Sequence, residues 1–308
     1  MDKRKLYEKY LICPKCAEEI ENNVCLGCGR KYKVIDGDIL DFFEINKSNE
    51  LSQKKWEEVF QDEFFQEKAG EEFKEVFLED TLRQMLDTIP CNKGVYLEIG
   101  CGQGHLGEEL ASRGDWFFIG VDYSKTALLQ LKKRLKKRNI SNFLLVRADI
   151  NELPVRSSTV DLVCGNGVIE HLEDTQRVVN HLHRVLKSGG ISFNTVPVFN
   201  IGNLVYRSFW GGIPNIPILK QVAEFVHIKL LKGKHMVFGY ELQFTYPQLF
   251  KMHVKAGFKK KNIKIERFEC HIHVHKLKNF PRLRKFFIKL CKTNRNFWPM
   301  IKVIAQKL

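Results

Sequence analysis

The sequence predicts an α/β protein whose core is a doubly wound, mostly parallel sheet, preceded by a small module with four closely spaced cysteines. Apolar runs of strand length alternate with stretches of helical period from Val95 to Val196, and a glycine-rich turn follows the first run. Two Cys-x-x-Cys pairs near the N-terminus predict the module. At 308 residues, the chain can form two domains, or one large domain with an appendage.

The composition is that of an ordinary globular protein. With 44% hydrophobic and 28% charged residues, a disordered or collagen-like chain is excluded. Prolines and charges interrupt the longest apolar stretch, residues 213–231, so we expect no transmembrane segment. Charged residues directly follow Met1 in place of a signal-peptide core, so we expect the protein in the cytosol, with peripheral membrane contact as an alternative.

The first predicted unit, residues 1–45, is a short β-rich module. Its cysteines form two pairs, Cys13/Cys16 and Cys25/Cys28, separated by eight residues. Four thiolates at this spacing can bind one tetrahedral Zn²⁺, and four cysteine ligands leave no open position for catalysis. Because so small a module has little core, metal binding would supply its folding energy, which makes the zinc structural. A redox dithiol and incidental cysteines are the alternatives.

The second predicted unit, residues 46–90, is an acidic helical linker or cap. Residues 49–90 contain 12 acidic and 5 basic side chains. Apolar residues such as Trp56, Phe60 and Leu82 recur at roughly helical intervals, which predicts one or two helices that end before Pro90.

The third predicted unit, residues 91–308, is the α/β domain itself, and its pattern is Rossmann-like. The expected strands are 95–99, 116–121, 143–147, 160–164 and 191–196. Helices are expected after the glycine-rich turn, over 127–138, and over 175–186 before the stop signal Ser188-Gly189-Gly190. A helix over 245–256 precedes strands at 261–268 and 300–306, which could close the sheet as a pair. Insertions are expected at about 199–235 and 276–298.

The glycine-rich turn runs from Glu98 to Gly104 and lies between a predicted strand and a predicted helix. Gly100, Gly102 and Gly104 would let the backbone turn sharply and approach a ligand, while the helix N-terminus offers N–H groups. The Gly-x-Gly-x-Gly spacing differs from the Gly-x-Gly-x-x-Gly of dinucleotide-binding proteins. A nicotinamide cofactor is therefore disfavoured.

Polar residues stand at the ends of the next strands. Asp122 and Tyr123 follow the second strand, where a carboxylate can accept both hydroxyls of a ribose. Asp149 and Ile150 follow the third strand, where a carboxylate can accept from an exocyclic amine and an apolar side chain can cover a purine. Asn166 ends the fourth strand at the floor of the expected crevice. This order fits an adenosyl ligand without phosphates.

On these residues the sequence resembles the class I S-adenosylmethionine-dependent methyltransferases, in particular the branch that includes the ubiquinone and menaquinone methyltransferases. Residues 98–104 look like the family's first motif, Asp122 like its ribose-binding residue, and Asp149-Ile150 like its adenine-contacting pair. Residues 168–190 are similar to its fourth-strand region and Lys-x-Gly-Gly turn, and 244–258 to its late helix. The resemblance covers about residues 93–270.

The resemblance implies a methyltransferase fold, S-adenosylmethionine as the cofactor and in-line methyl transfer to an acceptor. The residues expected to bind the cofactor are Glu98, Gly100, Gly102, Gly104, Asp122, Tyr123, Asp149, Ile150 and Asn166. His171, beside Glu170 at the crevice edge, is the candidate catalytic base, with a packing or capping role as the alternative. His271, His273 and His275 alternate as on one face of a strand, for which a surface role is preferred to metal binding.

The excess positive charge lies in the last third of the chain. Residues 200–308 contain 22 basic and 4 acidic residues, which favours a polyanionic partner. Aromatic residues in 199–235 suit an apolar lid, and a basic amphipathic helix near 283–290 suits an anionic membrane surface, with docking of that helix onto the sheet as the alternative. We expect a small-molecule or lipid-linked acceptor. An RNA nucleobase is the second candidate, and a cofactor-binding regulator without turnover is the third.

Overall fold

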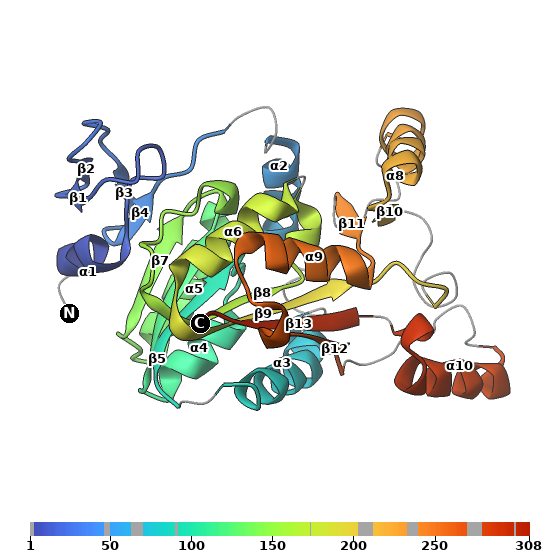
Figure 1. The fold of residues 1–308 in the computed structure, drawn as a ribbon. Helices are drawn as coiled ribbons and strands as arrows, with labels where there is room; N and C mark the ends of the chain where they lie inside the picture. Colours follow the sequence, from blue (N-terminus) through green and yellow to red (C-terminus); the bar gives the residue numbers. More distant parts are fainter. Residues whose placement is uncertain are drawn as a thin grey trace.

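The computed structural model describes residues 3–45, 50–62, 70–89, 92–172, 174–202, 212–232, 240–269, 279–298 and 300–308. Figure 1 shows a central sheet with helices on both faces, the N-terminal module at one end and helices α8 and α10 at the other. His271, His273 and His275 lie outside the described residues, as do parts of both predicted insertions. Among the described residues, no helix combines the length and apolarity that a membrane span requires.

The central sheet has nine strands in the order β12-β13-β9-β8-β5-β6-β7-β4-β3. The strands are β3 Lys33–Ile35, β4 Ile39–Asp41, β5 Gly94–Ile99, β6 Trp116–Asp122, β7 Phe143–Arg147, β8 Val160–Asn166, β9 Leu186–Pro197, β12 Ile263–Arg267 and β13 Met300–Gln306. From β7 through β6, β5 and β8 to β9, all neighbours are parallel, which confirms the predicted doubly wound core. β13 is antiparallel to β9 and to β12, so the predicted strand pair closes this edge.

Helices cover the two faces of the sheet and produce two buried apolar clusters. On one face, α3 (Gly70–Leu86), α4 (His105–Ser112) and α5 (Lys125–Lys137) pack over residues such as Tyr96 and Phe118. On the other face, α6 (Thr175–Val185) and α9 (Tyr246–Ala256) pack over residues such as Leu97 and Val163. Together with α2 (Glu50–Gln61), α3 confirms the prediction of two helices before residue 90.

Helix α6 ends at Val185, one residue before the predicted end at Leu186. The Ser-Gly-Gly segment, which was expected to follow the helix as its stop signal, lies in the first part of β9. Leu186 pairs with Val160 and Ile191 with Leu162, so the register shifts between these pairs. Gly189, with φ of 81°, provides a left-handed residue within this irregular stretch.

The N-terminal module adds strands to the central sheet. It comprises α1 (Lys3–Tyr10), the hairpin β1 (Ile20–Glu21) and β2 (Val24–Cys25), and the strands β3 and β4. β4 pairs in parallel with β7, and the Ile12 N–H donates to the Pro154 carbonyl at 2.8 Å. Leu11 is fully buried in the same apolar cluster as Val146 and Val155. Residues 1–45 therefore share both the sheet and the core of the α/β domain.

The first insertion contributes a second small sheet and a helix. β10 (Gly212–Pro214) and β11 (Glu241–Gln243) pair in parallel, and α8 (Pro217–Glu224) continues into a π-helical segment, η4 (Phe225–Leu230). The second insertion contains α10 (Pro281–Thr293). Both insertions contain helices, as the sequence predicts.

Candidate functional site

The glycine-rich loop joins β5 to α4 and adopts a left-handed backbone at three positions. The φ angles of Gly100, Gly102 and Gly104 are 54°, 47° and 60°, a region that other residues enter at a cost. A Cβ atom at Gly104 would lie 2.5 Å from Cδ2 of Leu131, and one at Gly100 would lie 2.8 Å from Cγ1 of Val168. Glycine is thus required for this turn.

Two buried carboxyl groups flank the loop. The Asp122 carboxylate at the end of β6 accepts hydrogen bonds from the backbone N–H groups of Gly102 and Ser124, both at 2.7 Å. Glu98 in β5 accepts from the Gly107 N–H at 3.0 Å. Burial raises the pKa of Asp122 to about 6 and that of Glu98 to about 8. At neutral pH, Asp122 is therefore mainly ionised, whereas Glu98 retains its proton.

The next strand end presents Asp149 and Ile150 in the 3₁₀ turn η2 (Ile150–Glu152). Asp149 Oδ1 accepts from both the backbone N–H and the side-chain amide of Asn151, each at 2.9 Å, so this carboxylate also caps the turn. Ile150 is buried, with 4% of its surface exposed. Tyr123 is partly buried, and its ring centre lies 5.9 Å from that of Phe43, a residue of the N-terminal module.

Asn166 and His171 lie at and after the end of β8. Asn166 Oδ1 accepts a hydrogen bond from the hydroxyl of Thr195 on the neighbouring strand β9. His171, in the 3₁₀ turn η3 (Ile169–His171), places Nδ1 2.7 Å from the Tyr240 carbonyl oxygen. Since a carbonyl oxygen can only accept, Nδ1 is the protonated nitrogen, and Nε2 of the neutral ring is the acceptor. Glu170 beside it is buried.

Helix α2 lies against the loop and the strand ends, which the sequence did not indicate. The Glu57 carboxylate accepts from the Ser124 hydroxyl at 2.7 Å and from the Thr126 N–H at 3.1 Å. A Cβ atom placed on Gly102 would lie 2.9 Å from the Phe60 ring. The Trp56 ring meets the edge of His171, with 5.5 Å between the ring centres. The only signal in the sequence was the helical spacing of Trp56 and Phe60. This spacing predicts that the two residues share a buried face, but it does not predict which part of the protein that face contacts.

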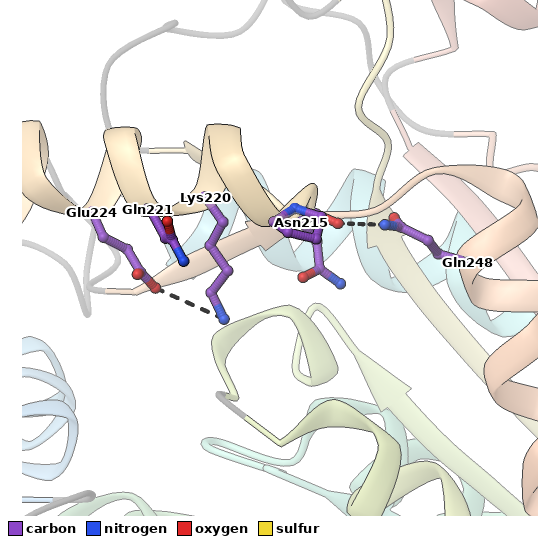
Figure 2. A pocket seen from close by; sticks show the side chains of 6 residues that line it. Asn215, Lys220, Gln221, Glu224 and Gln248 are labelled. Atoms are coloured by element: carbon purple, nitrogen blue, oxygen red, sulfur yellow. Dashed lines mark hydrogen bonds and ion pairs between the residues drawn. The ribbon is translucent and has the colours of Figure 1, made fainter.

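A polar pocket of about 550 Å³ lies between α8, the turn before it and α9. Figure 2 shows Lys220, Gln221 and Glu224 on one wall, and Asn215 and Gln248 on the adjoining wall. Lys220 Nζ lies 3.8 Å from Glu224 Oε1, which accepts a hydrogen bond from the Tyr240 hydroxyl at 2.6 Å. Because the carbonyl of Tyr240 accepts from His171, one residue connects the pocket to the crevice edge.

The donor side of this site suits a nucleoside with two ribose hydroxyls. Asp122 presents an ionised acceptor at a strand end, next to a loop whose glycines let Val168, Phe60 and Leu131 pack closely against its backbone. Helix α4 begins directly after this loop, so its N-terminus lies beside the same strand ends. The residues present therefore fit the methyl donor that the sequence implies.

Comparison with known families identifies this part of the chain. Residues 97–193 match the model of the methyltransferase domain family. This segment of the chain matches a methyltransferase domain, and curated relatives of the segment are named S-adenosylmethionine-dependent methyltransferases. The match begins in β5 and ends in β9, so it includes the glycine-rich loop, Asp122, Asp149, Asn166 and His171.

Relatives of this methyltransferase domain are similar over part of their length. A probable S-adenosylmethionine-dependent methyltransferase of Mycobacterium tuberculosis is 34% identical over 35% of this chain and 37% of its own length. The ubiquinone biosynthesis O-methyltransferase of Coxiella burnetii is 28% identical over 59% of this chain and 68% of its own length. The chain thus spans little more than a third of the first of these relatives.

A solved structure shows the same fold across most of the chain. A possible histamine N-methyltransferase of Thermotoga maritima aligns with 83% of this chain and 100% of its own length, with a TM-score of 0.51 and 16% identity. This likeness supports the fold of the methyltransferase domain.

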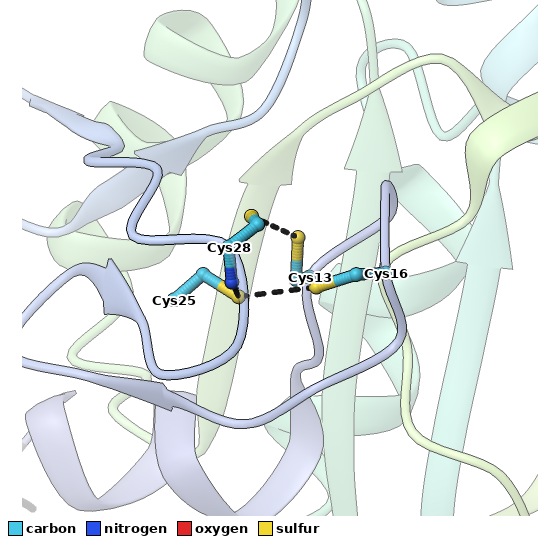
Figure 3. A group of neighbouring side chains, drawn as sticks. All are labelled: Cys13, Cys16, Cys25 and Cys28. Carbon is cyan, nitrogen blue, oxygen red and sulfur yellow. Dashed lines mark hydrogen bonds between the residues drawn. The ribbon is translucent and has the colours of Figure 1, made fainter.

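The four predicted metal ligands lie together at the N-terminal side of the methyltransferase domain. The sulfur atoms of Cys13, Cys16, Cys25 and Cys28 lie within 4.8 Å of one another, and Figure 3 shows the two pairs facing each other. The Cys13–Cys28 and Cys16–Cys25 sulfur distances are 3.8 and 3.3 Å. Tetrahedral Zn²⁺ with ligand bonds of about 2.3 Å requires sulfur atoms roughly 3.8 Å apart, so the arrangement fits a zinc ion.

Proposed function

We propose that this protein transfers the methyl group of S-adenosylmethionine to a small-molecule or lipid-linked acceptor. The observation that supports the proposal best is the buried Asp122 carboxylate beside the loop of residues 100–104, at the strand end where a ribose binds. The donor, when bound, supplies an activated sulfonium methyl group. The protein must then align the acceptor with this methyl group and exclude water, because proximity provides most of the catalysis.

We assign donor binding to the residues that surround the loop. Asp122 would accept the ribose hydroxyls, Asp149 and Ile150 would contact the adenine, and Asn166 would line the floor. Tyr123 and the glycine-rich loop with Glu98 complete this set. Helix α2 lies against the loop through Phe60 and against the strand ends through Glu57, so it would cover the bound donor and exclude water.

We assign the role of general base to His171 for acceptors with a hydroxyl or amine of high pKa. Its Nδ1–H donates to the Tyr240 carbonyl, so Nε2 carries the lone pair of the neutral ring, as a general base requires. The neighbouring Trp56 ring shields one side of the imidazole. The pocket of Figure 2, connected to His171 through Tyr240, would accommodate the polar part of the acceptor.

The acceptor class is supported by two observations. The pocket has polar side chains on both walls, and the ubiquinone biosynthesis relative acts, by its name, on a small molecule. A nucleobase of RNA is the second candidate, which the 22 basic against 4 acidic residues in 200–308 favour. Retention on RNA that weakens steeply with salt would support that alternative.

We propose a structural zinc ion at the cysteine cluster. Four thiolates would hold it without an open position. Its contribution would extend beyond the module, because β4 pairs with β7 and Lys15 forms an ion pair with Glu152 in the turn that contains Ile150. Metal analysis of the purified protein should give one zinc per chain.

Two measurements test the proposed reaction. Calorimetry should show that Asp122→Ala removes donor binding, whereas Asp115→Ala, at the exposed residue directly before the same strand, retains it. Mass spectrometry of cell extracts incubated with the protein and a deuterated methyl donor should reveal a labelled small molecule. Unchanged donor affinity in Asp122→Ala would contradict the assigned site.

A further inference from the structure

Exposed apolar side chains are concentrated at one end of the molecule. Of the fourteen large apolar side chains that are exposed among the described residues, six lie in α8 and η4 and three lie at α10. Those of α8 and η4 are Ile218, Leu219, Val222, Phe225, Ile228 and Leu230. Figure 1 places α8 and α10 at the end of the molecule remote from the N-terminal module. Such a concentration of apolar surface indicates an interaction site.

Helix α8 is amphipathic in a way that relates it to the pocket. Lys220 and Glu224 line the pocket, whereas Ile218, Val222 and Phe225, spaced four and three residues apart, are 76%, 57% and 52% exposed. One helix thus forms the pocket wall with its polar face and presents apolar side chains to the outside.

Helix α10 adds positive charge to its apolar residues. Phe280, Leu283 and Phe286 are 61%, 44% and 56% exposed. The helix also has basic but no acidic side chains: Arg282, Arg284, Lys285, Lys289 and Lys292, all exposed. With 13 residues it is about 20 Å long, too short to span a bilayer but sufficient to lie in its interface.

We propose that α8, η4 and α10 form a docking surface for an anionic lipid bilayer. Exposed apolar side chains would enter the headgroup boundary while the basic residues of α10 attract anionic lipids. A second copy of this chain is disfavoured because two such basic helices would repel each other. RNA would use the basic residues but would gain little from Ile218 or Val222, which cannot stack on bases. This inference deepens the proposed function, since it delivers a lipid-linked acceptor to the pocket behind α8.

Flotation with vesicles tests the surface. The full chain should float with vesicles of phosphatidylcholine and phosphatidylglycerol in equal parts and remain at the bottom with phosphatidylcholine alone. Phe225→Glu and Phe286→Glu should each weaken binding to the anionic vesicles about tenfold, because each removes an exposed ring and adds a repelled charge. Leu308→Glu is the matched control: Leu308 is 54% exposed, and this variant should float like the unmodified chain.

Donor affinity separates this inference from the proposed function. Calorimetry with S-adenosylhomocysteine should give the same affinity for all three variants, since none of these residues contacts the donor side. Absence of flotation, equal flotation of Phe225→Glu, Phe286→Glu and Leu308→Glu, or salt-sensitive retention on RNA without flotation would each overturn the membrane proposal. Donor binding would be unaffected by any of these outcomes.

Discussion

Ionisation of Asp122 should make donor binding sensitive to pH. Burial raises its pKa to about 6. Only the ionised form offers two acceptor oxygens to the two ribose hydroxyls, because protonation turns one of these oxygens into a donor. At pH 7 about nine-tenths of the protein is ionised at this residue, and at pH 5 about one-tenth. Because the apparent affinity scales with the competent fraction, we expect about tenfold weaker binding at pH 5.

The assay is calorimetric titration with S-adenosylhomocysteine at several pH values between about 5 and 8. Asp122→Asn serves as the comparison. It should bind about 10 to 100 times more weakly at pH 7, because it loses a hydrogen bond to a charged group, and its affinity should not change between pH 7 and 5. An unmodified protein whose affinity is constant down to pH 5, or an Asn variant with the same pH dependence, would refute the reasoning.

Stability should change with pH in the opposite direction. A buried acid whose pKa is raised in the folded state binds its proton more tightly there than in the unfolded chain. Its contribution to stability is therefore greatest at low pH and decreases as the pH rises from about 4 to the folded value of about 6. Loss of donor binding at pH 5 should thus occur without destabilisation by this residue, and thermal unfolding at each pH checks this.

Four further outcomes are expected. Gly102→Val, at φ of 47° and against Phe60, should lose measurable donor affinity while thermal unfolding shows destabilisation of only about 1–3 kcal/mol. Chelation of the proposed zinc should increase hydrogen exchange in β4 and β7 but not in α9; uniform exchange would argue against the structural role. Trp56→Ala should weaken donor binding about tenfold, and unchanged binding would contradict the covering role of α2. Burial raises the pKa of Glu98 to about 8, so the unmodified chain should lose stability as the pH rises from about 5 to 8. Glu98→Gln does not titrate, so over this range its free energy of unfolding should rise relative to that of the unmodified chain by on the order of 3 kcal/mol, measured by urea unfolding. Parallel pH dependences of the two proteins would contradict the raised pKa.

The predictions from sequence succeeded for features whose conformation depends on residues close to one another in the sequence. Strand β7 at Phe143–Arg147 and strand β13 at Met300–Gln306 have their predicted bounds, since each is a short, mostly apolar run of strand length. The left-handed Gly100–Gly104 turn follows from glycines between a strand and a helix. The end of α6 was predicted within one residue, but the glycines expected to terminate the helix lie in an irregular start of β9, where pairing with β8 prevails over the local signal.

Contacts between distant segments were decided by the tertiary structure alone. A helical pattern shows that Trp56 and Phe60 share a face, but it does not show that this face meets His171 and Gly102. Likewise, nothing in residues 39–41 indicates that β4 extends the sheet beside β7. Most helices and strands between residues 94 and 306, the glycine turn and the metal-binding spacing could be predicted from the sequence, because these depend on local conformation. Which elements pack together depends on burial of surface across the whole chain, and that decided how α2, Tyr240 and the N-terminal module complete the site.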